Sequence, residues 1–254
     1  EQRNFEAVLD MMSAGSLDVK PLITHRYDIE NAIEAYTLLD SPDALGIVLN
    51  YPNKSQELLT NSKVELASQK SKIIKPNTPC VGFIGAGNYA SRTLIPAFKE
   101  AGAVLDTLVT SGGISGVHHG NKNQFAIAST ETKDLWNNDT INTVSIVTRH
   151  DAHAQQVVDA LKSGKNVFVE KPLALTLDEL NVIDKAYHEA NKSNTVRLMV
   201  GFNRRYAPHI VKMKELLNSH RSPKSIIMTV NAGAIPSEHW VQNSLIGGGR
   251  IIGE

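Results

Sequence analysis

The chain has 254 residues, of which 41% are hydrophobic and 20% are charged, and its 26 Lys and Arg residues balance its 26 Asp and Glu residues. A balanced charge gives no general attraction to nucleic acid or to an anionic membrane, so a substrate has to be inferred from a local site. The length exceeds the roughly 100–150 residues of a typical domain and is enough to bury a substantial core.

The cysteine count and the apolar runs indicate the compartment. The single cysteine, Cys80, cannot form an intrachain disulfide, which is typical of a reducing cytosol, and its place in an apolar strand predicts an inert, buried side chain. No apolar run approaches the roughly 20 residues of a membrane-spanning helix, and the N-terminus lacks a signal-peptide pattern. We therefore expect a cytoplasmic protein with no membrane or nucleic-acid partner. The chain begins at Glu1 rather than Met and stops at IIGE, so we expect both ends to be cut from a longer protein.

The N-terminal part predicts a small α/β segment followed by a connector. Residues 5–14 have helical spacing, VKPLITHRY resembles a strand, Asp28 is placed to cap a helix over IENAIEAYTLL with Ile33 and Tyr36 on its apolar face, and GIVLNY is a second strand. This segment, residues 1–50, is too small to be a domain. Residues 51–79 are rich in Asn, Ser, Lys and Gln and predict a polar linker, with a short strand at KVEL as an option.

From residue 80 onward, strands alternate with helices. We expect strands at 80–84, 104–110, 125–129, 143–148, 166–170 and 196–201, with helices at 88–101, 152–163 and 177–191. This alternation predicts an α/β fold, a Rossmann doubly wound parallel sheet covering residues 80–202. A helix over HIVKMKELLNS and a β-rich KSIIMTVNAG then begin an incomplete α+β substrate or oligomerisation domain, residues 203–254.

A glycine motif joins the first of these strands to its helix. Gly85, Gly87 and Ala90 fit G-x-G-x-x-A, with Ala86, Asn88 and Tyr89 between them. In such a motif the first glycine allows a tight turn, the second admits a pyrophosphate and the small third residue packs the helix on the strand. The helix N-terminus then offers N–H donors to the phosphates. We expect these residues to bind a dinucleotide, against the alternative of a glycine turn without a ligand.

The second strand decides between NAD and NADP in this architecture. Asp106 has a suitable spacing but lies in the first half of its strand, so we interpret it as structural. The strand ends at Thr110, Ser111 and Gly112, where no carboxylate would bind a 2′-hydroxyl and no Arg would attract a 2′-phosphate. Ser111 therefore leaves both cofactors open, with a slight preference for NADP.

Two later strand ends carry polar residues that should face the same cleft, because ligands bind beyond the carboxyl ends of parallel strands. One strand ends in Thr148, Arg149 and His150, with Asp151 predicted to cap the next helix and His153 in its first turn. The next strand ends in Glu170, Lys171 and Pro172. A lysine beside a cationic nicotinamide suits proton transfer or polarisation of a hydroxyl, with a surface ion pair as the alternative. Thr176 and Glu179 then form the pattern of a capping box.

Together, VGFIGAGNYA, TRHDAHA, GKNVFVEKPLALT, VGFNRRYAPH and GGGRIIGE resemble the Gfo/Idh/MocA oxidoreductases over about residues 80–254. The resemblance implies NAD(P) and hydride transfer at a sugar or cyclitol carbon, with Lys171 as the catalytic lysine. It implies that Glu170 and Pro172 shape the nicotinamide pocket and that Thr148, Arg149, His150 and His153 line the cofactor. It places the proton-transferring histidine beyond Glu254, which makes turnover by this segment alone doubtful.

Residues 1–50 are similar to the end of a zinc-dependent medium-chain alcohol dehydrogenase, although they contain none of that family's zinc ligands and we assign His25 no metal role. We expect the chain to lie inside a fused dehydrogenase associated with polysaccharide metabolism, acting on a sugar, sugar nucleotide or cyclitol, and able to form a homo-oligomer. The alternatives are a non-catalytic NAD(P)-binding sensor or partner module, and chemistry carried by the upstream zinc domain.

Overall fold

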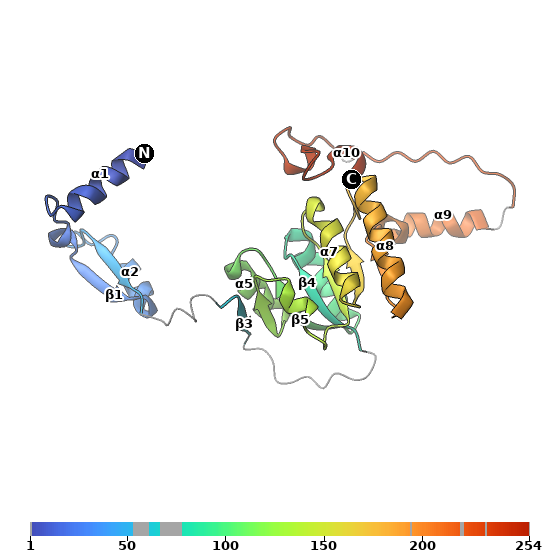
Figure 1. The fold of residues 1–254 in the computed structure, drawn as a ribbon. Helices are drawn as coiled ribbons and strands as arrows, with labels where there is room; N and C mark the ends of the chain where they lie inside the picture. Colours follow the sequence, from blue (N-terminus) through green and yellow to red (C-terminus); the bar gives the residue numbers. More distant parts are fainter. Residues whose placement is uncertain are drawn as a thin grey trace. The chain divides into compact units, whose positions relative to one another are not determined.

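The computed structural model describes residues 2–52, 61–66, 78–193, 195–218, 221–231 and 233–253 (Figure 1). The chain divides into two compact units, Glu1–Asn61 and Ser62–Glu254. None of the helices in the described residues is long and apolar enough to cross a membrane. The second unit contains the predicted glycine motif and both polar strand ends.

The first unit is a small parallel pair of strands with helices beside it. Its elements are α1 (Gln2–Ser13), β1 (His25–Asp28), α2 (Ala32–Thr37) and β2 (Ile47–Asn50). Asp28 makes no side-chain cap, because a 3₁₀ turn at Ile29–Asn31 precedes the helix, and Ile33 and Tyr36 of the predicted apolar face are exposed. Among the described residues of this unit only Ala35 is a fully buried hydrophobic side chain, so the unit has almost no core of its own.

The second unit is built on a seven-stranded sheet of the predicted α/β class. Its strands are β3 (Lys63–Glu65), β4 (Cys80–Ile84), β5 (Val104–Val109), β6 (Ile127–Ser129), β7 (Thr143–Ile146), β8 (Asn166–Val169) and β9 (Leu198–Val200), in the order β3-β6-β5-β4-β7-β8-β9. All pairs are parallel except β3 with β6. Every residue of β4 is buried, as expected for the centre of a sheet covered on both faces. Burial raises the pKa of the Cys80 thiol to about 12, so this cysteine is inert.

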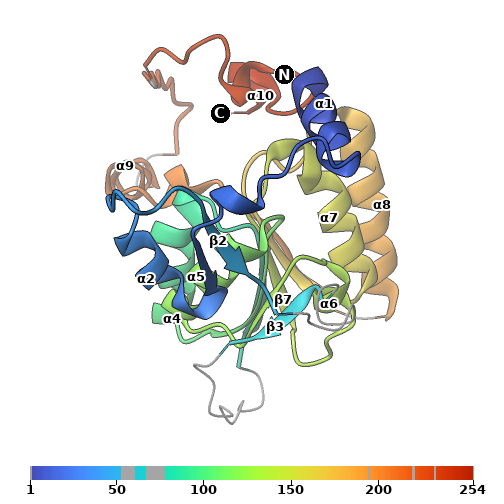
Figure 2. The ribbon, with the colours of Figure 1, turned by 90° about the vertical axis from the view of Figure 1, so that its left-hand side faces the viewer.

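Helices cover both faces of this sheet. They are the π-helical turn η3 (Ala90–Leu94), α4 (Ile95–Glu100), α5 (Gly113–Asn123), α6 (Lys133–Trp136), α7 (His150–Lys162) and α8 (Leu177–Ser193). Figure 2 shows α4 and α5 on one side of the sheet and α7 and α8 on the other. Pro96 lies in the first turn of α4 and lacks an N–H, which accounts for the widened turn just before it.

The short strand that KVEL allowed within the predicted linker is present as β3, which pairs with β6. Two differences from the sequence predictions have physical causes. Helix α5 was not predicted, because its glycines hide the helical pattern; a Cβ on Gly120 would lie 2.4 Å from Cδ1 of the buried Leu66, so close packing requires glycine there. The described residues of the predicted β-rich stretch at 224–233 form no strand, since they have no partner strand to pair with.

The remainder of the second unit returns to the sheet. After η4 (Asn203–Tyr206) and α9 (Pro208–Asn218), the chain reaches η5 (Trp240–Gln242) and α10 (Gly249–Ile252). Asp151 donates its backbone N–H to Ile246 O at 3.1 Å. Asp151 was predicted to cap α7, but it lies inside the first turn of this helix, and Arg149 occupies the N-cap position. These contacts bring residues 240–253 to the carboxyl ends of β7 and β8.

Candidate cofactor and active site

A cleft of about 1000 Å³ opens at the carboxyl ends of the central strands. It is lined by Ile84, Gly85, Ala86, Gly87, Asn88, Val109, Thr110, Ser111, Ser115, Thr130, Thr132, Val147, Thr148, Arg149, Gln156 and Trp240. This position, beyond the strand ends where the order of the sheet reverses at β4, is the usual ligand site of a doubly wound fold. Seven of the predicted site residues meet here: Gly85, Ala86, Gly87, Asn88, Ser111, Thr148 and Arg149.

The glycine turn has the geometry that a pyrophosphate needs. Gly85 has φ +100°, and a Cβ on it would lie 2.7 Å from Val147 O, so only glycine fits. Gly87 has no heavy atom within 4 Å of its Cβ position, which leaves its backbone open to the cleft. Ala90 is 2% exposed and packs the following turn on the sheet rather than lining the cleft. The residues present therefore fit a dinucleotide whose phosphates approach the backbone.

Hydroxyl groups dominate the side of the cleft formed by the ends of β5 and β6. Thr110 and Ser115 each donate a hydrogen bond to Gly112 O at 2.8 Å, which fixes the turn that carries Ser111. No described lining residue of the cleft is a carboxylate. Asp106 instead accepts hydrogen bonds from Thr107 Oγ1 at 2.7 Å and Asn138 Nδ2 at 2.9 Å, which matches its interpretation as structural.

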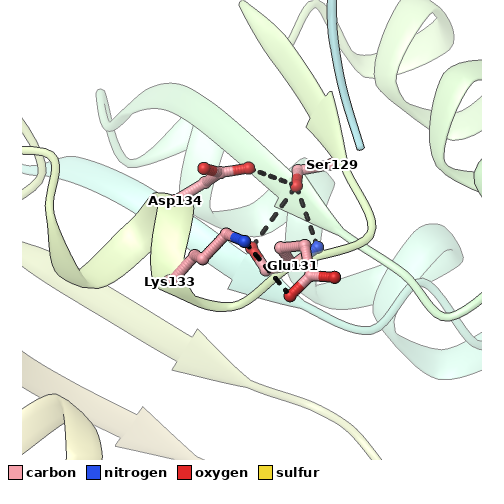
Figure 3. Close-up of polar contacts among 4 residues, drawn as sticks. All are labelled: Ser129, Glu131, Lys133 and Asp134. Carbon is pink, nitrogen blue, oxygen red and sulfur yellow. Dashed lines mark hydrogen bonds and ion pairs between the residues drawn. The ribbon is translucent and has the colours of Figure 1, made fainter. Parts of the chain in front are cut away.

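The turn after β6 is held by a buried serine (Figure 3). Ser129 donates to Asp134 Oδ2 at 2.6 Å and accepts the backbone N–H of Glu131 at 2.9 Å. Lys133 and Glu131 form an ion pair at 3.9 Å whose side chains are largely exposed, so it contributes little stability. The serine network fixes the turn from which Thr130 and Thr132 line the cleft.

The end of β7 contributes the opposite wall. Thr148 donates from Oγ1 to Gln156 Oε1 at 2.8 Å, and both residues line the cleft. The Arg149 guanidinium lies 5.8 Å from the ring centroid of Trp240, within cation–π range. Trp240 comes from residues far along the chain, so nothing at the strand end of β7 could have predicted it.

The two predicted histidines lie behind this wall rather than in it. His153 is fully buried, with Nδ1 2.7 Å from Pro172 O and Nε2 3.2 Å from Thr148 O. His150 is 9% exposed, and its Nδ1 lies 2.8 Å from Gly247 O. Burial lowers the pKa of both rings below the usual value of 6.5, against the opposing effect of these hydrogen bonds. His153 thus connects the segment after β7 with the segment after β8, and His150 connects the start of α7 with Gly247.

The end of β8 places the predicted catalytic lysine on a different surface. Lys171 donates from Nζ to Gly253 O at 2.7 Å, and it lines a second cavity, of about 690 Å³, together with Pro172. Burial raises the pKa of Glu170, whose Oε1 is buried and has no hydrogen-bond partner in the described chain. A Cβ on Gly201 would lie 2.6 Å from that oxygen, so glycine makes room for the carboxyl group.

Tyr89 is the remaining predicted residue, and it does not line the cleft. Its hydroxyl accepts a hydrogen bond from Asn203 Nδ2 at 3.0 Å, which connects the start of η3 to η4 after β9. Some polar and aromatic lining residues were not predicted. Thr130 and Thr132 follow the end of β6 and obey the same rule as Thr148, whereas Ser115, Gln156 and Trp240 carry no local signal.

Comparison with known proteins identifies the second unit. Residues 80–202 match the Gfo/Idh/MocA oxidoreductase family, described as having an NAD-binding Rossmann fold. The match covers just under half of the chain, so residues 80–202 are similar to this family, as the sequence predicted. The matched residues include the glycine turn and Ser111, Thr148 and Arg149 of the cleft.

Two curated relatives and one solved structure illustrate the proteins that this chain resembles. Oxidoreductase P35 of Formosa agariphila is 35% identical over 140 residues, 55% of this chain and 42% of the relative. Inositol 2-dehydrogenase/D-chiro-inositol 3-dehydrogenase of Lactiplantibacillus plantarum is 31% identical over 152 residues, 58% of this chain and 41% of the relative. A levoglucosan dehydrogenase solved with NADH and levoglucosan shares the fold, with a TM-score of 0.55 at 20% identity over 67% of this chain and 49% of that one. The chain thus spans about two fifths of the length of these curated relatives.

The described residues contain no cluster of three or more His, Cys, Asp or Glu side chains that could hold a metal ion.

Proposed function

We propose that this protein is an NAD(P)-dependent oxidoreductase that transfers a hydride between the nicotinamide and a carbon bearing a hydroxyl or carbonyl group of a sugar, sugar nucleotide or cyclitol. The observation that carries this proposal is the pairing of a glycine-turn cleft at β4 with Lys171 at the end of β8, one strand beyond β7. The relatives with inositol dehydrogenase names support the substrate class.

The nicotinamide supplies or accepts the hydride when it is bound. The part of Lys171 is to orient the reacting oxygen and to donate a hydrogen bond to it, or to move its proton. Its hydrogen bond to Gly253 O holds the ammonium group at the strand end, where it is ready for this role. In this proposal His150, His153, Glu170 and Pro172 position the lysine, and Tyr89 and Ala90 hold the glycine turn.

The cofactor preference within the proposal is NADP, with NAD as the alternative. The hydroxyl of Ser111 can donate to a 2′-phosphate, and no described carboxylate lines the cleft to repel it. A carboxylate would be the usual partner of a free 2′-hydroxyl. No described Arg or Lys lines this side of the cleft, so the hydroxyl and backbone N–H groups would have to hold the 2′-phosphate.

A titration of the chain with NADH and with NADPH, followed by nucleotide fluorescence, tests the proposal. We expect saturable binding of at least one cofactor. Gly87→Asp should abolish it, because a carboxylate would occupy the space open to the phosphates. Ala101→Asp is the control, since Ala101 is exposed, has a φ of −70° and lies in the turn before β5, at the amino ends of the strands. A folded chain that binds neither cofactor would contradict the proposal.

The first unit has its own place in the proposal. The sequence resemblance makes residues 1–50 the end of a zinc-dependent alcohol dehydrogenase domain joined to the oxidoreductase, and the nearly coreless β1–β2 pair is in keeping with a piece of a larger domain. Zinc analysis and alcohol oxidation assays of the longer protein test this part. A cytoplasmic location and a homo-oligomeric state belong to the same proposal, and light scattering tests the second.

A further inference from the structure

Gln156 is a polar side chain of the cleft that neither the glycine motif nor the strand ends explain. It lies in the second turn of α7, is half-buried, and lines the cleft together with Thr148 and Arg149. Its Oε1 accepts the hydrogen bond from Thr148 Oγ1 at 2.8 Å. Its Nε2 makes no hydrogen bond to any residue that the structure describes.

Thr148 therefore determines what Gln156 offers to a ligand. The Thr148 hydroxyl donates its hydrogen bond to the carbonyl oxygen of the Gln156 amide and holds this side chain in one orientation. An amide has two N–H donors besides its carbonyl oxygen. Gln156 thus presents hydrogen-bond donors on the wall of the cleft.

The other lining residues indicate which half of a dinucleotide lies there. The cleft includes the glycine turn and the ends of β5 and β6, represented by Ser111 and Thr132, whereas Lys171 lines the separate second cavity. In this architecture the phosphates lie over the glycine turn and the adenosine ribose at the end of the second strand, here β5. Because Gln156 shares its cleft with the ends of β5 and β6 and not with Lys171, we place it on the adenosine side.

We propose that Gln156 recognises the adenine base of the cofactor, by donating a hydrogen bond from its side-chain amide to a ring nitrogen of the base. This inference rests on the proposed binding of NAD(P). It makes Gln156 a binding residue that selects the nucleotide base, and Thr148 the residue that positions it. A base-reading residue on the helix gives the cleft specificity that the backbone contacts of the glycine turn cannot give.

Substitution of Gln156 by Leu tests the inference, with NADH titration and displacement of NADH by ADP as the two measurements. Loss of one neutral hydrogen bond lowers affinity by roughly 3- to 10-fold. Because ADP carries the adenosine half and no nicotinamide, its affinity should fall by the same factor as that of NADH. Gln155→Leu is the matched control: Gln155 is exposed on the adjacent position of α7, donates to Asp159 Oδ1 at 2.8 Å, and should leave both affinities unchanged.

Each outcome separates the possibilities. A fall in NADH affinity without a fall in ADP affinity would put Gln156 on the nicotinamide side and overturn the inference, as would two unchanged affinities. Gln156→Glu, which keeps the size of the side chain but lacks the donor, should repeat the loss, so a folding defect of the Leu variant would not decide the result. If the unmodified chain binds neither NADH nor NADPH, the proposed function fails instead, because the variants then have nothing to lose.

Discussion

Lys171 follows the end of β8, near the cofactor cleft, but its side chain points to the second cavity. There its Nζ donates a hydrogen bond to Gly253 O. A backbone carbonyl is a neutral acceptor, so it holds the ammonium group without neutralising it. The ammonium group can thus still interact with a substrate oxygen.

We expect Lys171→Ala to lower kcat for a sugar or cyclitol substrate by about 10²-fold or more, which is the usual loss when a positioned proton donor is removed. NAD(P)H affinity should change little, because Lys171 does not line the cofactor cleft. Steady-state kinetics and cofactor titration measure the two effects. Lys185→Ala, which removes an exposed lysine of α8, is the control, and an unchanged kcat in the Lys171 variant would exclude it from the mechanism.

His153 predicts a dependence of stability on pH. Burial lowers its pKa below 6.5 in the folded state, so the folded chain binds fewer protons than the unfolded chain between the two values. Stability should therefore be highest above pH 6.5 and should fall as the pH decreases through the lowered pKa. Glu170, whose pKa is raised from 4.5, gives the opposite slope above that value, so the test compares a variant with the unmodified chain.

Thermal unfolding of His153→Gln between about pH 5 and pH 7 makes this comparison, because that interval includes the ordinary titration range of histidine. The variant should show a flatter dependence of Tm on pH than the unmodified chain. His188→Gln is the control, since His188 is exposed and its removal should leave the slope as it was. Identical slopes for the His153 variant and the unmodified chain would show that the pKa of this ring is the same in the folded and unfolded states, which would contradict the prediction.

Strand β3 is the first secondary-structure element of the second unit, which begins at Ser62. The strand pairs with β6, Thr130 donates its N–H to Ser62 O at 2.9 Å, and Leu66 is buried at 6% exposure beside α5. A chain that starts at residue 78, two residues before the predicted domain boundary at residue 80, loses all of these contacts. It also exposes β6 as an unprotected edge strand.

We expect a segment of residues 78–254 to be less stable than a segment of residues 62–254 by about 2 kcal/mol, the value of burying one leucine side chain. Urea unfolding of the two segments measures the difference. Leu66→Ala in the longer segment should reproduce most of it, because the strand hydrogen bonds remain. Equal stabilities would show that β3 contributes no net stability to the unit.

The elements that the sequence predicted well are those whose pattern is set locally. Strand β4 is an apolar run that is buried throughout. The capping box is present as predicted, with Glu179 N–H donating to Thr176 Oγ1 at 3.1 Å and Thr176 N–H donating to Glu179 Oε2 at 3.1 Å. Helix α5 and strand β3 depend on each other through Gly120 and Leu66, and neither has a strong pattern alone. Their pairing is a tertiary effect that local propensity does not contain.

The candidate site likewise combines residues that a local rule predicts with residues that only the tertiary fold brings together. The rule that ligands lie beyond the carboxyl ends of parallel strands placed the glycine turn, Ser111, Thr148 and Arg149 at one cleft. The same rule predicted that His150 and His153 would line the cleft, but both side chains are buried. The rule identifies the strand end and does not specify which face of the following helix is turned to the cleft. Trp240 reaches the cleft only through the return of residues 240–253 to the strand ends.

This return has a practical consequence. The chain has two tryptophans, and one of them, Trp240, forms part of the cleft wall while the other, Trp136, packs against the core beneath α7. Indole emission overlaps the absorption of reduced nicotinamide, so a nucleotide bound near Trp240 would quench that emission by energy transfer. Replacing Trp136 with Phe would leave a single emitter at the cleft, and the chain would then carry its own optical reporter of occupancy.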